Sequence, residues 1–304
     1  MLATPWPAPF DDPGWIFELK WDGVRCLLSV DETVQLTSRA GNNMTARYPE
    51  LAGLDLPPAI VLDGEIVALD DSGRPSFELL QSRMSTTPVG SSPVPVTYVA
   101  FDLLYDGESL LQVPLERRWE RLSELLLPAP VVTADRFSGV SGPIWQFVLD
   151  RDLEGIVAKR LGSSYVPGNR SPDWRKIGNF KQVRAVVGGF TAGTGGRSST
   201  YGALLLGLSD GDRLRWIGSV GSGFDDRSLR MIRSALDQMT VTESPFRPDS
   251  ELPVGSTWVE PRLVAMVRFK QWTLSGRLRA PSFKGFTSDP ADTVTFGSEG
   301  PEPR

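Results

Sequence analysis

Residues 17–25 read FELKWDGVR, and this stretch ends one apolar run and begins another. Lys20 lies two residues before the Asp22-Gly23 pair, and Arg25 closes the stretch. An Asp-Gly pair between two apolar runs is a strong β-hairpin signal, so one interpretation is a solvated turn between two antiparallel strands. The other interpretation is a nucleophilic lysine beside a phosphate group, with Asp22 accepting the amine proton and Arg25 binding phosphate oxygens. The stretch alone leaves both interpretations open.

The composition limits the chemistry that such a lysine can take part in. The 304 residues contain no histidine and one cysteine, Cys26, which excludes histidine-based triads, zinc sites and an internal disulfide. Catalysis must then rest on Lys, Arg, Asp and Glu, with an oxygen-bound metal such as Mg²⁺ as the expected metal. No apolar run is long enough for a membrane span, and the N-terminus lacks a signal-peptide pattern, so we expect a cytoplasmic protein.

Positive charge is concentrated in two segments, although the formal net charge is −5. Residues 155–184 contain many cations and a single acid, Asp173, and residues 262–288 contain cations and no acid. Ordinary solvated faces would explain either segment alone. Because both segments adjoin candidate catalytic motifs, we predict a focused anion-binding surface.

The strand and helix patterns divide the chain into two parts. In the first part, an amphipathic helical pattern at 115–126 occurs among strand-like runs, which predicts an α+β domain. These runs are residues 15–21, 24–30, 34–41, 59–70, 94–105 and 154–161. In the second part, short strand-like runs surround one helical segment at 225–239, a pattern that favours a small OB-type barrel. We therefore predict two domains, 1–182 and 183–304.

Acidic residues in two motifs suggest a hard cation or ribose hydroxyls as ligands. In VLDGEIVALD, Asp63 and Glu65 are two residues apart in a predicted strand, so their side chains project from one face. Like charges on one face are costly unless they bind a cation or hydrogen-bond donors. Glu154 is a third acid, at the start of another predicted strand. Hairpin-edge acids would explain each residue singly, but not all three together.

Cations and one aromatic ring complete the candidate site. Lys159 and Lys176, with Arg39 in SRAG, have the charge that phosphate binding requires. The two lysines could also converge on Lys20 and, together with burial, favour the neutral amine that acts as a nucleophile. Phe101 could stack on a purine ring, although its pattern also fits a core position.

The motifs occur in the order and spacing of the covalent nucleotidyltransferases. The segments are KWDGVR, SRAG, LDGEIVALD, FDLLYDG, EGIVAK and the DWRK region. Over about residues 1–290 the sequence resembles the ATP-dependent DNA ligases, especially the bacterial end-joining type. This resemblance implies an ATP-grasp-like nucleotidyltransferase domain of antiparallel sheets, residues 1–182, followed by an OB-fold domain, residues 183–304.

The resemblance also implies a reaction. Lys20 would attack the α-phosphate of ATP and carry AMP, which passes to the 5′-phosphate of a nick and is displaced by the 3′-hydroxyl. The expected site residues are Lys20, Asp22 and Asp63 in catalysis, Glu18, Arg25, Glu65, Phe101, Lys159 and Lys176 in nucleotide binding, Asp63 and Glu154 in Mg²⁺ or Mn²⁺ binding, and Arg39, Arg279 and Lys284 in DNA binding. The implied partners are nicked duplex DNA and a Ku-like end-binding protein, and we expect a monomer associated with the nucleoid.

Two departures from the family pattern concern the first chemical step. The fifth motif usually has a second lysine two residues after Lys176, where this chain has Gly178, with Lys181 as a candidate substitute. The last motif usually ends Arg-x-Asp-Lys, where residues 287–290 read Thr-Ser-Asp-Pro. Loss of one preorganised charge can lower a rate by about a hundredfold or more. Self-adenylation is therefore the step that the sequence supports least.

Two other functions are compatible with the sequence. One is an RNA ligase or an mRNA-capping guanylyltransferase, because these enzymes share the lysine motif. The other is a nick-binding protein whose self-adenylation is impaired, which the missing cations of the last motif favour.

Overall fold

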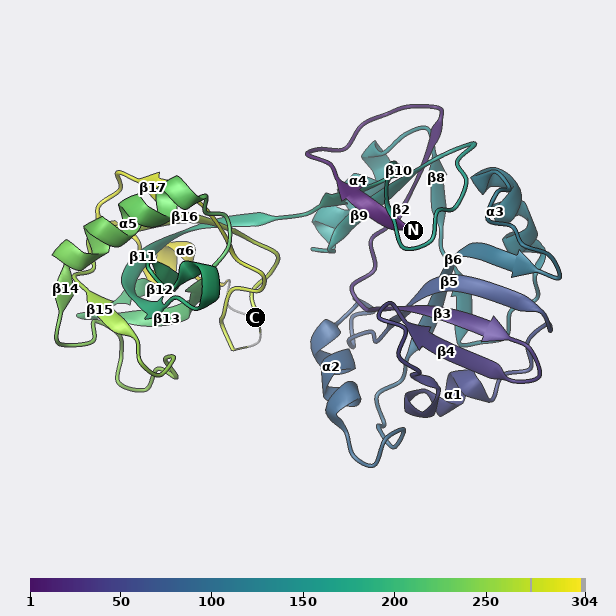
Figure 1. Cartoon of the computed structure of the whole chain (residues 1–304), viewed down its shortest axis with the longest axis horizontal. Helices are drawn as coiled ribbons and strands as arrows, with labels where there is room; N and C mark the ends of the chain where they lie inside the picture. Colours follow the sequence, from purple (N-terminus) through teal and green to yellow (C-terminus); the bar gives the residue numbers. More distant parts are fainter. Residues whose placement is uncertain (274, 302–304) are drawn as a thin grey trace. The chain divides into compact units, whose positions relative to one another are not determined.

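The chain forms two units, Met1–Asn179 and Phe180–Arg304, in a computed structural model that describes residues 1–273 and 275–301. Figure 1 shows the elements of both units. The division lies a few residues before the predicted boundary at 182. The reason is that Lys181 and Gln182 already pair with a strand of the second unit. Within the described residues, no helix has the length and apolar composition needed to span a membrane.

The first unit contains two five-stranded sheets. One sheet has the strand order β1 (Leu2–Pro5), β10 (Arg170–Gly178), β9 (Gly155–Arg160), β2 (Trp15–Leu19) and β8 (Arg136–Ser138). The other has the order β4 (Val34–Ser38), β3 (Val24–Val30), β5 (Ile60–Val67), β6 (Thr97–Asp106) and β7 (Val131–Thr133). Neighbouring strands are antiparallel except for the parallel pairs β1–β10 and β6–β7.

Helices cover one face of each sheet in the first unit. The short segments η1 (Thr45–Arg47) and α1 (Pro49–Ala52), with α2 (Phe77–Ser85) and α3 (Leu115–Glu124), lie on the β3–β6 sheet (Figure 1). The helix α4 (Gly142–Asp150) buries Ile144 and Val148 against Phe17 of β2 and Ile156 of β9. The uncovered faces meet each other, since Trp174 of β10 packs in one cluster with residues of β6. Alternating side chains of both sheets therefore point into the space between them.

The Asp22-Gly23 pair does not form a hairpin. The strands β2 and β3 on either side of it lie in different sheets and do not pair with each other. The segment crosses from one sheet to the other, and a Cβ atom on Gly23 would lie 2.1 Å from the carbonyl oxygen of Ile66. The glycine thus permits close approach of two backbones rather than a tight turn. The hairpin interpretation is wrong, and the crossing brings Lys20 to the space between the sheets.

The second unit is built on one seven-stranded sheet with helices packed against it. Its elements are β11 (Lys181–Ala192), η2 (Gly195–Arg197), β12 (Tyr201–Asp210), β13 (Arg213–Val220), α5 (Asp226–Gln238), β14 (Thr240–Val241), β15 (Thr257–Val259), β16 (Val264–Phe269), β17 (Ser282–Thr287), η3 (Ala291–Thr293) and α6 (Phe296–Glu299). One edge of β11 pairs with β12, and the opposite edge pairs with β15 at one end and β16 at the other. The helix α5 buries Leu229, Ile232 and Leu236 in the core.

Most predicted elements coincide with observed ones, and the differences have local causes. Residues 257–269 form two strands, β15 and β16, and not one. Pro261 lies between them and has no N–H group to donate to a sheet. Strand β10 has few apolar residues in the sequence RSPDWRKIG and carries no strand-like alternation. The helix predicted at 115–126 is observed as α3 and ends at Glu124.

Candidate active site

A pocket of about 230 Å³ lies in the first unit where the uncovered faces of the two sheets meet. Most of the predicted site residues line it: Glu18, Lys20, Arg25, Arg39, Glu65, Phe101, Lys159 and Lys176. The other lining residues are Leu2, Ala3, Leu19, Trp21, Val157, Arg170 and Trp174. Residues far apart in the sequence therefore form one mixed aromatic and charged pocket.

Strand alternation explains why these side chains meet. Lys159 pairs with Trp174 in the β9–β10 ladder, and the strand β2 places Glu18 on the same side of that sheet. On the facing sheet, Arg25 of β3 and Glu65 of β5 are directly opposite each other in register. Period-two alternation sends the neighbours of these residues into the cores under the sheets. The polar side chains are thereby left at the pocket.

Lys20 lies at the start of the segment that crosses from β2 to β3, and its side chain contacts an acid. Its backbone N–H donates to the carbonyl oxygen of Gly155 at 2.9 Å, which fixes the chain after β2. Its Nζ atom lies 2.7 Å from Oε1 of Glu154, and the two side chains are 27% and 8% exposed. The amine is therefore positioned by a carboxylate and remains accessible from the pocket.

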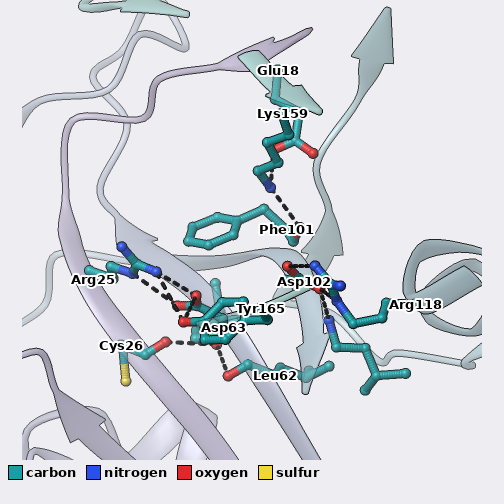
Figure 2. A network of polar contacts seen from close by, with 12 residues as sticks. Glu18, Arg25, Cys26, Leu62, Asp63, Phe101, Asp102, Arg118, Lys159 and Tyr165 are labelled. Atoms are coloured by element: carbon teal, nitrogen blue, oxygen red, sulfur yellow. Dashed lines mark hydrogen bonds and ion pairs between the residues drawn. The ribbon is translucent and has the colours of Figure 1, made fainter. Parts of the chain in front are cut away.

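Lys159 forms a second lysine–glutamate pair, which is buried. Its Nζ atom lies 2.6 Å from Oε2 of Glu18, and the side chains are 1% and 4% exposed. The same ammonium group donates to the carbonyl oxygen of Phe101 at 2.8 Å and lies 4.6 Å from the Phe101 ring and 4.4 Å from the Trp174 ring (Figure 2). Burial raises the pKa of Glu18, and the Lys159 charge acts against that rise. This lysine supports the pocket wall.

Arg25 is oriented by Asp63 and Tyr165. Its Nε atom donates to Oδ1 of Asp63 at 3.0 Å, and its Nη2 atom donates to Oδ2 at 2.6 Å. The Tyr165 hydroxyl donates to the same Oδ2 at 2.7 Å (Figure 2). Burial alone would lower the pKa of Arg25, but the Asp63 carboxylate outweighs it and raises the pKa. A two-point pair of this kind fixes the plane of the guanidinium group at the pocket.

Asp63, predicted as a catalytic and metal-binding residue, lies beneath the pocket. Its side chain is fully buried and does not line the pocket; Oδ1 accepts a hydrogen bond from Arg25, and Oδ2 accepts from Arg25 and Tyr165. Alternation places Asp63 and Glu65 on one face, but Asp63 lies deeper in the layer. In this structure Asp63 orients Arg25, and its catalytic and metal-binding role stays a prediction.

A second buried ion pair, between Arg118 and Asp102, lies beside Tyr165. Arg118 donates to both carboxylate oxygens of Asp102 at 2.7 and 2.8 Å, and its Nη1 atom donates to the carbonyl oxygen of Ser163 at 2.9 Å. The Arg118 guanidinium also lies 5.9 Å from the centre of the Tyr165 ring. The irregular segment that carries Tyr165 is thus tied to Arg118 of α3 and through it to Asp102 of β6. Figure 2 shows Arg118 and Asp102 beside Tyr165.

Glu65 has an unusual protonation equilibrium. Burial raises its pKa to about 8, with a further rise from Glu154 and an opposing effect from Lys20 and Arg25. At neutral pH this carboxyl group is therefore mostly protonated and can donate a hydrogen bond into the pocket. A ribose hydroxyl could accept such a hydrogen bond.

The predicted metal ligands are not brought together. Asp63 is turned to Arg25, and Glu154 contacts Lys20. In residues 1–273 and 275–301, no group of three Asp, Glu, His or Cys side chains could hold a metal ion. Mg²⁺ commonly binds to few carboxylates together with phosphate oxygens of a substrate. The metal-binding roles of Asp63 and Glu154 therefore stay predictions.

The remaining predicted residues lie outside this pocket or at its rim. Arg39 is exposed on the turn after β4 and lines the pocket, whereas Asp22 does not line it. Arg279 and Lys284 belong to the second unit, where Lys284 is exposed on β17 and Arg279 is half-buried. Their DNA-binding roles stay predictions.

The structure shows the surroundings of Gly178 and of residues 287–290, the two places where the sequence departs from the family pattern. Gly178 is directly opposite Gly155 in the β9–β10 ladder, at the end of the strand that carries Lys176. In the last motif, Asp289 contacts Arg184 at 3.1 Å, and Arg184 also contacts Glu299 at 2.5 Å.

Sequence reasoning missed two residues that shape the pocket. Trp174 is two residues before Lys176 in β10 and lies on the same face, but the sequence of this strand does not identify it as a strand, so its alternation could not be used. Tyr165 lies in an irregular segment without periodicity, and no sequence pattern pointed to it.

Comparison with known proteins gives matches along almost the whole chain. Residues 1–178 match the ATP dependent DNA ligase domain, and residues 197–290 match the ATP dependent DNA ligase C terminal region. The chain is 38% identical over 299 residues to the multifunctional non-homologous end joining protein LigD of Mycolicibacterium smegmatis, covering 95% of this chain and 38% of LigD. It is 31% identical to the SPbeta prophage-derived DNA ligase-like protein LigB of Bacillus subtilis, covering 94% of this chain and 97% of LigB.

A solved structure gives the same result for the fold. The structure of mycobacterial DNA ligase D complexed with ATP and MES is 35% identical, with a TM-score of 0.56, covering 97% of this chain and 96% of that chain. The predicted α+β architecture, a nucleotidyltransferase domain followed by an OB-fold domain, is confirmed by these matches. The chain spans little more than a third of the length of the LigD relative.

Proposed function

Because this chain belongs to the ATP-dependent DNA ligase family, we propose that it seals nicks in duplex DNA through AMP carried on Lys20. The observation that carries the proposal is the accessible Nζ atom of Lys20 in a pocket with three aromatic side chains and several cations. Glu154, at 2.7 Å, is close enough to receive a proton from this amine. A nucleophile beside a base, facing a phosphate-binding pocket, is the arrangement that covalent nucleotidyl transfer requires.

In the first proposed step, the neutral amine of Lys20 attacks the α-phosphorus of ATP. A P–N bond forms, the P–O bond to the departing pyrophosphate breaks, and Glu154 takes the amine proton. Arg25 and Lys176 line the pocket and would stabilise the charge that develops on the phosphate oxygens. Positioning and charge stabilisation supply most of the rate in such transfers.

The nucleoside would lie against the aromatic and acidic walls. Phe101 and Trp174 both line the pocket, and an adenine base can stack on an aromatic ring. The protonated carboxyl group of Glu65 would donate to a ribose hydroxyl. The buried Lys159–Glu18 pair would keep the wall behind the base in place.

In the later proposed steps, AMP passes from Lys20 to the DNA. The 5′-phosphate attacks, the P–N bond breaks, and a pyrophosphate linkage joins AMP to the DNA end. The 3′-hydroxyl then attacks the 5′-phosphate and AMP leaves. Arg39, exposed at the rim, would contact the 5′-phosphate. A divalent metal, Mg²⁺ or Mn²⁺, would arrive with the ATP phosphates, because the predicted protein ligands do not assemble.

The relatives suggest the biological setting. Several carry the name non-homologous end joining protein, so we infer a role in repair by end joining, with a Ku-like end-binding protein as partner. The chain would provide only the ligase part of such a reaction, as a monomer. The other activities of the longer relatives are not attributed to it.

The test is a paired assay on the purified chain. One arm follows transfer of label from α-labelled ATP to the protein, and the other follows sealing of a nick that already carries AMP. We expect activity in both arms, with ATP and not GTP as donor and DNA ends preferred over RNA ends. A preference for GTP or for RNA ends would instead favour the capping or RNA ligase alternative, and inactivity in both arms would overturn the proposal.

A second candidate function is a nick-binding protein with impaired self-adenylation. Residues 287–290 carry no cation, and Asp289 is already paired with Arg184. Normal binding to nicked DNA together with failure in both arms would favour this candidate. Sealing of the pre-adenylated nick without label transfer would mean that only the first step is impaired.

A further inference from the structure

The outer edge of strand β13 in the second unit is closed by two loop segments. One segment, residues 245–250, runs beside Leu214, whose backbone N–H donates to Pro245 at 2.8 Å and whose carbonyl accepts from Arg247 at 2.9 Å. The other segment, residues 275–278, reaches the same edge further along, where the Leu278 N–H donates to the carbonyl oxygen of Ile217 at 2.8 Å. These hydrogen bonds satisfy edge groups that would otherwise be exposed.

A pocket of about 250 Å³, here called the β13 pocket, opens where these two segments meet the strand. Its lining residues are Arg215, Trp216, Arg247, Asp249, Ser250, Ser275 and Arg277. Each of the three chain segments thus contributes one arginine. Arg279 and Lys284, the residues predicted to bind DNA, do not line it.

The three arginines differ in how their charge is balanced. Arg247 contacts Asp210 at 2.7 Å and Asp249 at 3.4 Å. Within the described part of the chain, no carboxylate lies within ion-pair distance of Arg215 or Arg277. These two guanidinium groups therefore bring positive charge that the protein does not neutralise at contact distance.

The surroundings of Arg277 and Arg215 hold their side chains in place. Arg277 lies 4.0 Å from the centre of the Trp216 ring and donates to the Trp216 carbonyl oxygen. Arg215 lies 4.0 Å from the centre of the Phe296 ring. Burial lowers the pKa of Arg277; the Glu251 carboxylate acts against this, Arg215 lowers the pKa further, and Asp249 raises it. Two oriented, like-charged guanidinium groups would be stabilised by an anion between them.

We propose that the β13 pocket binds one phosphate group, with Arg215 and Arg277 as the charged donors. Guanidinium groups match the geometry of phosphate oxygens, and the hydroxyl groups of Ser250 and Ser275 line the same pocket. Asp249 and, outside the lining, Asp210 balance Arg247, whereas Arg215 and Arg277 have no carboxylate at ion-pair distance among the described residues. The phosphate group belongs either to the DNA backbone, a source that rests on the proposed function, or to free phosphate in solution.

The experiment compares two pocket variants with one matched control in the full chain. Arg215→Gln removes a charge without a known hydrogen bond, and Ser275→Asp adds a negative charge at an exposed position. Arg230→Gln removes the same charge from an exposed site on α5 that does not line the pocket. Affinity for nicked duplex DNA is measured over a range of salt concentrations, and binding of inorganic phosphate is measured by calorimetry. Label transfer from ATP and the Tm are recorded for every variant.

Each outcome decides the proposal. If the phosphate comes from DNA, both pocket variants should bind DNA about three- to tenfold more weakly, with a salt slope smaller by about one, and Arg230→Gln should not. If it is free phosphate, only the calorimetric binding should be lost in the two pocket variants. Wild-type behaviour of both pocket variants in both assays would overturn the proposal. Binding needs no catalysis, so absent label transfer in the wild type would count against the proposed function alone.

Discussion

Two lysine–glutamate pairs in the first unit have nearly the same length and very different surroundings. Lys20 and Glu154 are 2.7 Å apart, and the lysine side chain is 27% exposed. Lys159 and Glu18 are 2.6 Å apart, and both side chains are almost completely buried. Both lysines line one pocket, so the pairing alone does not identify the nucleophile. The two lysines differ in their access to solvent and, within the part of the chain that the structure describes, in the number of groups that hold the ammonium.

The additional contacts of Lys159 explain the difference in role. Its ammonium group also donates to the Phe101 carbonyl and lies against two aromatic rings, which leaves it no freedom to approach a phosphorus atom. Lys20 follows the end of β2 at the crossing between the sheets and can turn toward a ligand. The comparison therefore favours Lys20 as the proposed nucleophile and a supporting role for Lys159.

The largest effect should come from replacing the proposed nucleophile. Lys20→Arg retains the positive charge and the contact with Glu154 but cannot supply a neutral amine, because an arginine stays protonated. We expect label transfer from ATP to fall by a factor of about 1,000 or more, with little change in Tm. Label transfer above about a tenth of the wild-type rate would break the distinction between the two lysines.

Breaking the buried pair should act mainly on stability. Lys159→Met leaves the Glu18 carboxylate buried without its partner, which should reduce the free energy of unfolding by about 3–5 kcal/mol in urea titrations. Lys20→Met, at the more exposed pair, should cost less than about 1 kcal/mol. The double variant Lys159→Met, Glu18→Gln should recover part of the loss. Equal costs for the two single variants would contradict the contrast.

The protonation of Glu65 provides a third test, because this acid interacts with both members of the Lys20–Glu154 pair. Its pKa is raised from 4.5 to about 8, so the folded state retains a proton that the unfolded state loses between these values. This contribution to stability is complete below about pH 4.5 and is lost as the pH rises toward 8. Glu65→Gln should remove this decline, which we expect to be on the order of 2 kcal/mol after solvent screening. The measurement is Tm against pH for both proteins, and parallel curves would exclude the assigned proton.

The smallest effect should come from removing the hydroxyl group of Tyr165, which donates to the Asp63 carboxylate. Tyr165→Phe removes the hydrogen bond to Asp63 and should cost about 1 kcal/mol of stability. Arg25 would keep both contacts with Asp63 but lose some orientation, so the ATP concentration for half-maximal label transfer should rise a few-fold while the maximal rate changes little. Single-turnover label transfer over a range of ATP concentrations measures both quantities. An unchanged half-maximal ATP concentration would show that Asp63 alone positions Arg25.

The sequence predicted individual strands better than their pairing. The runs at 15–21 and 24–30 are the strands β2 and β3, but an Asp-Gly pair looks the same in a hairpin and in a crossing between sheets. The decisive fact is the approach of Gly23 to the backbone of β5, which is a long-range contact that local patterns do not contain. The same limit explains why the polar strand β10 was missed.

For the candidate site, the motifs predicted which residues take part, and the structure shows how deeply each side chain is buried. Alternation correctly placed Asp63 and Glu65 on one face, but it could not show that Asp63 would be buried under Arg25. The sequence could not predict the roles of Tyr165 and Arg118. Tyr165 lies in an irregular segment, and Arg118 has the pattern of a surface position on an amphipathic helix. Buried ion pairs of this kind depend on which segments fold over the sheet.

The most direct test of the central claim is to locate the AMP on the protein by mass spectrometry. The chain would be incubated with ATP and Mg²⁺, digested at neutral or basic pH to preserve the phosphoramidate, and its lysine-containing peptides analysed. We expect a single adduct on Lys20, absent in Lys20→Arg and retained in a chain carrying Lys181→Arg. An adduct on Lys159 or Lys176 instead would contradict the assignment of chemistry to the accessible pair.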